Sequence, residues 1–181
     1  ESRRFFWFIN DDYQECFEDS VTDRGLLKEV REHALWLTER ICREAGETVS
    51  GRRALAAACT AFSHSCKDGE TGIGERSCLR ERALLIWREL LAEDGKDVAN
   101  KRGLALALRL AGLAGLEQKS SGAEEEALRQ LKEALSLRRE ILKEAGKPAD
   151  KRMLADSCDD LADLYRGDVF SDTDESRPDG V

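Results

Sequence analysis

The sequence predicts an all-α fold, an α-solenoid of about three and a half antiparallel helix pairs, on three observations. Only 2 of the 181 residues are proline, and 36% are charged with both signs mixed, as is typical of long surface helices. Similar segments recur at a spacing of 49 to 51 residues. In three of the four repeats, apolar or small residues step by 4, 3 and 4, which places them on one face of an α-helix.

The most similar segments each end in glycine. They are Ala34–Gly46, Ala83–Gly95 and Ala134–Gly146, and their starts lie 49 and 51 residues apart. Each terminal glycine follows a helical pattern that ends in charged residues, so the glycine is expected to end the helix in the left-handed conformation. These segments are predicted to be the second helix of each pair.

A basic pair opens the first helix of each unit. The pairs are Arg52-Arg53, Lys101-Arg102 and Lys151-Arg152, with Arg3-Arg4 at the corresponding place near the start of the chain. An apolar ladder follows each of the last three pairs. The ladders are Leu55, Cys59, Phe62 and Cys66; Leu104, Leu108, Ala111 and Gly115; and Leu154, Cys158, Leu161 and Tyr165.

These elements predict one repeat domain over residues 1–166 and an acidic tail over 167–181 that is expected to be disordered. The predicted units lie near 1–46, 52–95, 101–146 and 151–166, so the fourth has only its first helix. The predicted helices lie near 3–18, 23–45, 52–67, 75–94, 100–117, 123–145 and 151–166.

The first unit departs from the ladder pattern. Its corresponding residues are Phe6, Asn10, Tyr13 and Phe17, so a polar residue and aromatics replace the small apolar set. A degenerate first unit is expected of a cap, whose outer face has no neighbour. A strand over Phe5–Ile9 is the competing interpretation, because aromatic residues favour strands.

Charge and hydropathy limit the function classes. A net charge of −8 argues against a dedicated nucleic-acid binder, which would concentrate Lys and Arg. No apolar run approaches the roughly 20 residues that cross a bilayer, so no membrane association is expected and the protein is expected to be soluble. Because the chain begins at Glu1, an excised domain or processed product is expected.

Six cysteines are scattered without a C-x-x-C pair. Several occupy positions where other units carry Leu, Ala or Phe, so reduced core residues are favoured over disulfides or metal ligands. Reduced cysteines favour a cytoplasmic location. The six are Cys16, Cys42, Cys59, Cys66, Cys78 and Cys158.

Two segments resemble the tetratricopeptide repeat of the kinesin-light-chain type. Leu154–Tyr165 is similar to its first helix and Glu125–Leu135 to its second. Small residues stand where that family needs close contact between paired helices: Ala111, Gly112, Ala127, Ala134 and Ala162. The period differs, because the ordinary repeat has 34 residues. An unrelated α-solenoid or an irregular helical bundle is the alternative.

The resemblance implies that first helices line a concave groove that holds a peptide or a helix of a partner protein. Four aspartates crowd one side of the first helix of the fourth unit, which costs helix stability unless cations compensate. They are Asp156, Asp159, Asp160 and Asp163. A basic partner segment is one interpretation; a solvated acidic face neutralised by Arg152 and Arg166 is the other. The residues expected to line the groove are Thr60, His64, Arg109, Leu113, Asp156, Asp159 and Asp163.

Catalysis has little support. His33 and His64 are the available near-neutral bases, and neither lies in a motif. His64 and Cys66 are two apart and so point in different directions on a helix. The glycines of 69–74 lack the Lys-Ser/Thr of a phosphate-binding loop. We therefore expect no enzyme activity, no catalytic residue, no cofactor and no metal.

Two further hypotheses concern assembly. The incomplete fourth unit leaves an apolar edge around Leu161, Leu164 and Tyr165, through which the chain is expected to self-associate or to contact the rest of a longer chain. The alternative function is a regulatory, sensor or oligomerisation part of a larger multidomain protein whose enzyme lies elsewhere. The tryptophans Trp7, Trp36 and Trp87 are expected to pack in the core or between units.

Overall fold

The computed structural model describes residues 33, 35–40, 43–44, 48–65, 72–117 and 121–171. This part of the chain is helical apart from short connections, and no strand occurs within it. The predicted all-α class is therefore confirmed. The chain divides into two compact units, Glu1–Gly95 and Lys96–Val181, and the division falls after one of the glycines predicted to end a helix.

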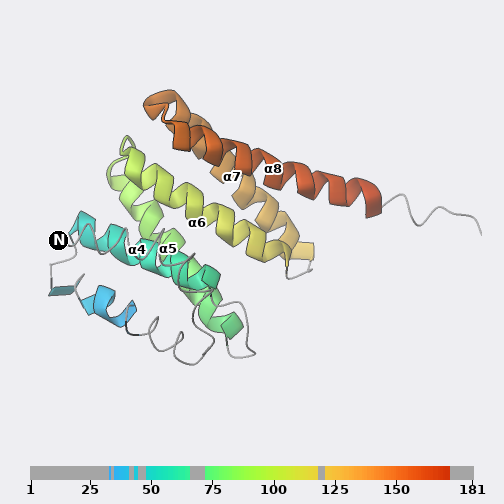
Figure 1. Ribbon diagram of the computed structural model, residues 1–181. Coiled ribbons are helices and arrows are strands. Elements are labelled where there is room, and N and C mark those ends of the chain that lie inside the picture. Colours follow the sequence, from blue (N-terminus) through green and yellow to red (C-terminus); the bar gives the residue numbers. More distant parts are fainter. Residues whose placement is uncertain are drawn as a thin grey trace, which may run out of the picture. The chain divides into compact units, whose positions relative to one another are not determined.

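The first unit contains the helix pair α4 (Val49–Ser65) and α5 (Gly72–Glu93) (Figure 1). The pair is antiparallel, because Arg52 at the start of α4 donates to Glu93 at the end of α5, with Nη1 2.7 Å from Oε1. The predicted apolar ladder of α4 is buried at each described position. The buried apolar side chains of the pair include Leu55, Cys59 and Phe62 of α4 and Ala83, Trp87 and Leu90 of α5.

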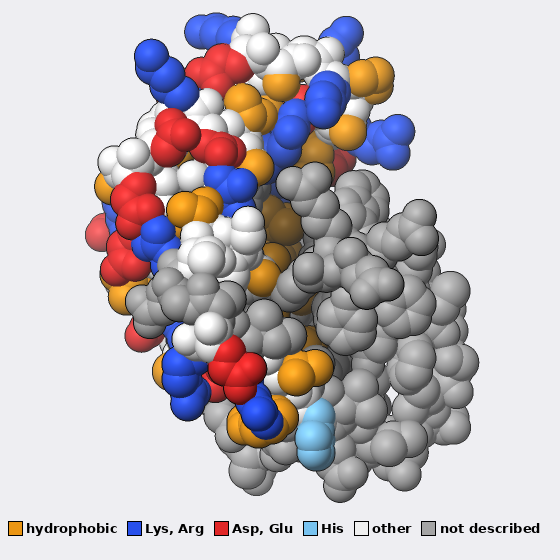
Figure 2. Space-filling view, turned by 90° about the vertical axis from the view of Figure 1, so that its left-hand side faces the viewer, with side chains coloured by type: hydrophobic (Ala, Val, Ile, Leu, Met, Phe, Trp, Pro, Cys, Tyr) orange, Lys and Arg blue, Asp and Glu red, His pale blue; other side chains and the backbone are white. Residues whose placement is uncertain are grey.

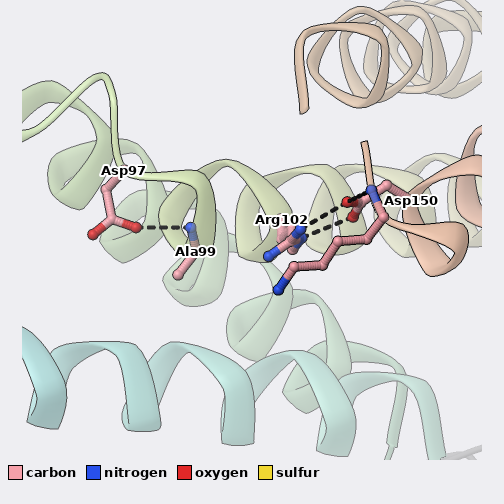
Figure 3. Close-up of polar contacts among 5 residues, drawn as sticks. Asp97, Ala99, Arg102 and Asp150 are labelled. Carbon is pink, nitrogen blue, oxygen red and sulfur yellow. Dashed lines mark hydrogen bonds and ion pairs between the residues drawn. The ribbon is translucent and has the colours of Figure 1, made fainter. Parts of the chain in front are cut away.

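The second unit contains α6 (Val98–Leu116), α7 (Ser121–Ala145) and α8 (Pro148–Ser171) (Figure 1). Asp97 caps α6, and its Oδ1 accepts a hydrogen bond from the amide of Ala99 at 2.7 Å (Figure 3). The same oxygen accepts from the amide of Asn100 at 3.2 Å. This satisfies two of the amides that a helix start leaves without intrahelical partners. Pro148 opens α8, where its fixed φ suits the first turn.

Helices α6 and α7 are antiparallel and touch closely through small residues. A Cβ added to Gly112 would lie 2.8 Å from Cγ of Leu131 and 3.0 Å from the carbonyl oxygen of Ala127. A Cβ on Gly115 would lie 3.1 Å from that of Ala127. At the other end, Lys101 of α6 reaches Glu144 of α7, with Nζ 2.6 Å from Oε1. The small residues at 112 and 127 thus lie where the two helices meet.

The predicted left-handed glycine is found at Gly146, whose φ is 59°, but not at Gly95. Gly146 ends α7, and the next helix starts two residues later. At Gly95 the chain leaves α5 differently: the amide of Asp94 still bonds to the carbonyl of Leu90, and Asp97 then caps α6. The predicted helix end near Gly95 is therefore found, since α5 ends at Glu93, but the predicted left-handed conformation is not.

The helices begin up to three residues before their predicted starts, and α8 differs most. It runs to Ser171, five residues into the segment predicted to be a disordered tail from residue 167. The helix predicted at 3–18, the alternative strand at 5–9, Gly46 and the tail beyond 171 lie outside the described residues.

Candidate functional site

An ion pair joins the facing sides of α6 and α8. Arg109 of α6 donates to Asp160 of α8 through two guanidinium nitrogens, with Nη2 2.9 Å from Oδ1. The side chain of Asp160 is only 13% exposed, and that of Arg109 is 25% exposed. The hydrogen bond to Asp160 raises the pKa of Arg109, and the nearby Asp156 acts in the same direction. Arg109, predicted to face a partner, is therefore already paired within the chain.

A second ion pair joins the same two helices closer to their N-termini (Figure 3). Arg102 donates from Nε and Nη2 to both carboxylate oxygens of Asp150, at 2.8 and 2.7 Å. The Arg102 guanidinium, through its hydrogen bonds, holds the pKa of the buried Asp150 carboxyl below its ordinary value. Asp150 also accepts from the amide of Lys147 at 3.3 Å and so ties the connection between α7 and α8.

The predicted aspartates divide into two sets on α8. Asp160 faces Arg109, whereas Asp159 and Asp163 are exposed and Asp156 is half-buried. Asp163 lies 2.7 Å from Arg166, one turn along the same helix. Of the two arginines proposed to neutralise this side, Arg166 therefore contributes. Exposed ion pairs of this kind contribute little stability, so a partner could replace Arg166 at little cost. Asp156, Asp159 and Asp163 together are called the acidic strip.

Arg138 of α7 contacts the same side of α8, one turn before Asp160. It is buried, and its Nη1 donates to the backbone carbonyl of Met153 and, at 2.6 Å, to Oγ of Ser157. Burial lowers the pKa of this guanidinium, and the positive charge of Arg109 acts in the same direction. Its Nη2 has no hydrogen-bond partner among the described residues. The sequence analysis did not single out this arginine, although Ala134 and Leu142, four residues before and after it, are apolar and could have indicated a buried position.

The groove residues predicted on α4 are placed differently from each other. Thr60 is 4% exposed, and its hydroxyl donates to the carbonyl of Ala56 at 2.8 Å. Its hydroxyl is therefore used inside the protein, which corrects the expectation that Thr60 contacts a partner. His64 is exposed. On α6, Leu113 is half-buried, four residues beyond Arg109.

Cysteine and tryptophan burial follows the prediction only in part. Cys59 is fully buried, and burial raises the pKa of its thiol to about 11. Cys78 and Cys158 are exposed and unpaired, which corrects the expectation that they belong to the core. Trp87 is buried, whereas Trp36 is 55% exposed, with the Arg40 guanidinium over its ring. The remaining cysteines and Trp7 lie outside the described residues.

The predicted apolar edge at the end of α8 is only partly open. Leu161 is buried and Leu164 is half-buried, so these side chains already pack within the second unit. Tyr165 is 48% exposed, and the ammonium of Lys132 on α7 lies 5.9 Å from the centre of its ring. Leu161 therefore belongs to the core and not to an edge.

Charged side chains of both signs are interspersed over the described part of the face in Figure 2. Within the described residues, no group of three or more His, Cys, Asp or Glu side chains could hold a metal ion. Among the described helices, none combines the length and apolar character needed to span a bilayer.

Comparison of the chain with protein-family models, with curated proteins and with solved structures finds no match.

Proposed function

We propose that this chain is a protein-protein interaction module built as a tetratricopeptide-like α-solenoid, whose first helices bind a segment of a partner protein. One observation carries the proposal: the same kind of contact joins the two helices within each of two helix pairs. Arg52 at the start of α4 binds Glu93 at the end of α5, and Lys101 at the start of α6 binds Glu144 at the end of α7. These residues occupy corresponding places in the 49-to-51-residue repeat.

A repeated helix pair supports a solenoid for a physical reason. One pair cannot bury its apolar stripe alone, whereas stacked pairs make a continuous core and leave their first helices side by side. In the second unit, α6 and α8 are two such first helices, joined by Arg102–Asp150 and Arg109–Asp160. Extended binding surfaces are the common use of such stacks.

The proposed binding surface is confined to α6 and α8. Its exposed or half-exposed members are Leu113 on α6 and Asp156, Asp159 and Asp163 on α8. With Arg109 neutralised by Asp160, the strip carries net negative charge beside one apolar side chain. A partner segment with basic residues fits this chemistry, because opposite charge speeds association and disfavours acidic competitors.

The test is a quantitative pull-down from an extract of the source cells with three forms of the chain. In the Asp156→Lys/Asp159→Lys variant the strip is reversed in charge, whereas Arg109 and Asp160 are kept. The matched control, Glu124→Lys/Glu125→Lys, changes the same charge on the exposed start of α7. We expect a partner that the wild type and the control recover and that the strip variant loses at least tenfold. Equal recovery by all three forms would show that the strip binds no partner.

A further inference from the structure

No helix among the described residues covers one side of α8, whereas the corresponding sides of α4 and α6 are covered. Its contact side meets α6 and α7 through Asp150, Ser157, Asp160 and Leu161. Another side of α8 is formed by residues at helical spacing, and each of these residues is exposed or half-buried. This open face consists of Lys151, Leu154, Ala155, Cys158, Ala162 and Tyr165.

The corresponding side of α6 is covered by α7. Lys101 corresponds to Lys151, and its side chain is only 7% exposed beneath Glu144. Leu104 and Leu108 correspond to Leu154 and Cys158, and both are fully buried. Farther along the same side, Gly112 and Gly115 lie against the start of α7. The repeat therefore shows what covers this side of a first helix: an antiparallel helix with a glutamate near its end.

The corresponding side of α4 is closer to the open face in its residue types than that of α6 is. It carries Arg52, Leu55, Ala56 and Cys59, where α8 carries a basic residue, Leu, Ala and Cys at the same spacing. On α4 the two apolar residues and the cysteine are buried. The Cys59 thiol interacts electrostatically with Arg82 and Cys78 of α5, so this side faces α5.

Charge identifies the missing contact. Arg52 and Lys101 each bind a glutamate in the last turn or two of the covering helix. Lys151 has no ion-pair partner among the described residues. In an antiparallel pairing of two copies of α8 centred on Cys158, Tyr165 of the copy, and not a carboxylate, would lie opposite Lys151. The open face is thus complementary to a different helix, one with a carboxylate near its C-terminus.

We propose that the open face of α8 binds an amphipathic helix of a partner protein, antiparallel to α8, whose C-terminal glutamate pairs with Lys151. The partner helix presents small and apolar side chains to Leu154, Ala155 and Cys158, as α5 does to α4. This site is separate from the acidic strip of α8, because the two sets lie on different sides of the helix. It therefore does not depend on the function proposed for the strip.

The closest available probe is α5 itself, because the side of α4 that it covers matches the open face. A peptide of residues 72–93, with Cys78→Ser, is added to the full chain, and the alkylation rate of Cys158 by iodoacetamide is followed by mass spectrometry. The same sequence is also fused after Val181, which holds it near α8 at a high effective concentration. We expect Cys158 labelling to fall at least tenfold in the fusion and on saturation with the peptide. Labelling of the exposed Cys78 should not change in either case.

Charge reversal tests the proposed register. Lys151→Glu should restore Cys158 labelling to within about twofold of the unprotected rate, and Glu93→Lys in the fused segment should restore protection. The matched control is Lys143→Glu, an exposed change on α7 that should leave protection intact. No protection in either the peptide or the fusion experiment would overturn the proposal, as would protection that ignores Lys151. Cys158 protected in the chain alone and released on dilution would overturn it in favour of a second copy.

Discussion

Asp160 of α8 receives two hydrogen bonds from Arg109 of α6, across 51 residues of sequence. Asp159, its neighbour in the chain, is exposed. Adjacent aspartates of one acidic cluster thus have different roles: one joins two helices, and the other faces solvent.

Asp160→Asn should lower the free energy of unfolding by about 1–3 kcal/mol, because it removes the charge that Arg109 faces in a poorly solvated site. Arg138 lies close enough to repel the unpaired Arg109. Asp159→Asn is the matched control and should change stability by no more than about 0.5 kcal/mol. Urea unfolding at pH 7 measures both. Equal effects of the two changes would mean that the Arg109–Asp160 contact contributes nothing.

Gly112→Ala should destabilise the second unit by about 1–3 kcal/mol. The new methyl group would lie 3.0 Å from the carbonyl oxygen of Ala127, a backbone atom, so α6 and α7 must move apart. This cost exceeds the roughly 1 kcal/mol that alanine gains over glycine within a helix. Gly122→Ala is the control: nothing lies within 4 Å of its added Cβ, so stability should stay the same or rise by up to about 1 kcal/mol. Thermal denaturation should show a lower melting temperature for Gly112→Ala and an unchanged or higher one for Gly122→Ala.

Acid should remove the contribution of Asp150. Arg102 holds the pKa of Asp150 below its ordinary value near 3.8, so the folded state binds this proton less readily than the unfolded state. The resulting stability is fully present above about pH 4 to 5 and is lost as the pH falls through the lowered value. Asp150→Asn should therefore be less stable than the wild type at pH 7, and the difference should shrink below about pH 4. Unfolding curves from pH 7 to pH 2 test this; a difference that grows on acidification would contradict it.

Cys59 should react with iodoacetamide far more slowly than Cys78 and Cys158 in the native protein. Burial raises the pKa of Cys59 to about 11, so only about a thousandth of it is thiolate at pH 8, and access is blocked as well. The two exposed thiols should be labelled first, and Cys59 should become reactive in denaturant. Site-resolved mass spectrometry gives the three rates. Rapid native labelling of Cys59 would contradict the burial of the α4 ladder.

The sequence predicted the helices of the described region well, because apolar residues at helical spacing and terminal glycines are local signals. It could not predict which aspartate meets Arg109. That choice depends on how α8 is rotated against α6, and residues 159 and 160 differ by about 100° around the helix.

The exposure of Cys158 could not be predicted from the sequence either. Its local pattern matches that of Cys59, so the sequence placed both in a core. Cys59 is buried because α5 lies over α4, whereas no described helix covers Cys158. Burial is a property of the neighbours, so the same local pattern gives an exposed thiol on a helix face that no described helix covers. Thr60 is a related case, since a polar residue on a helix can satisfy its hydroxyl at a carbonyl four residues earlier.

The contacts Arg52–Glu93 and Lys101–Glu144 also restrict how the chain can change in length. Each joins the first turn of one helix to the end of the next, so the two residues must keep their rotational phase. One residue inserted within α5 or α7 would turn the glutamate by about 100° away from its cation. The same insertion at 118–120, between α6 and α7, would leave both helices in phase. Natural insertions and deletions should therefore collect between the helices, and the spacing from each helix start to its own charged residue should stay constant.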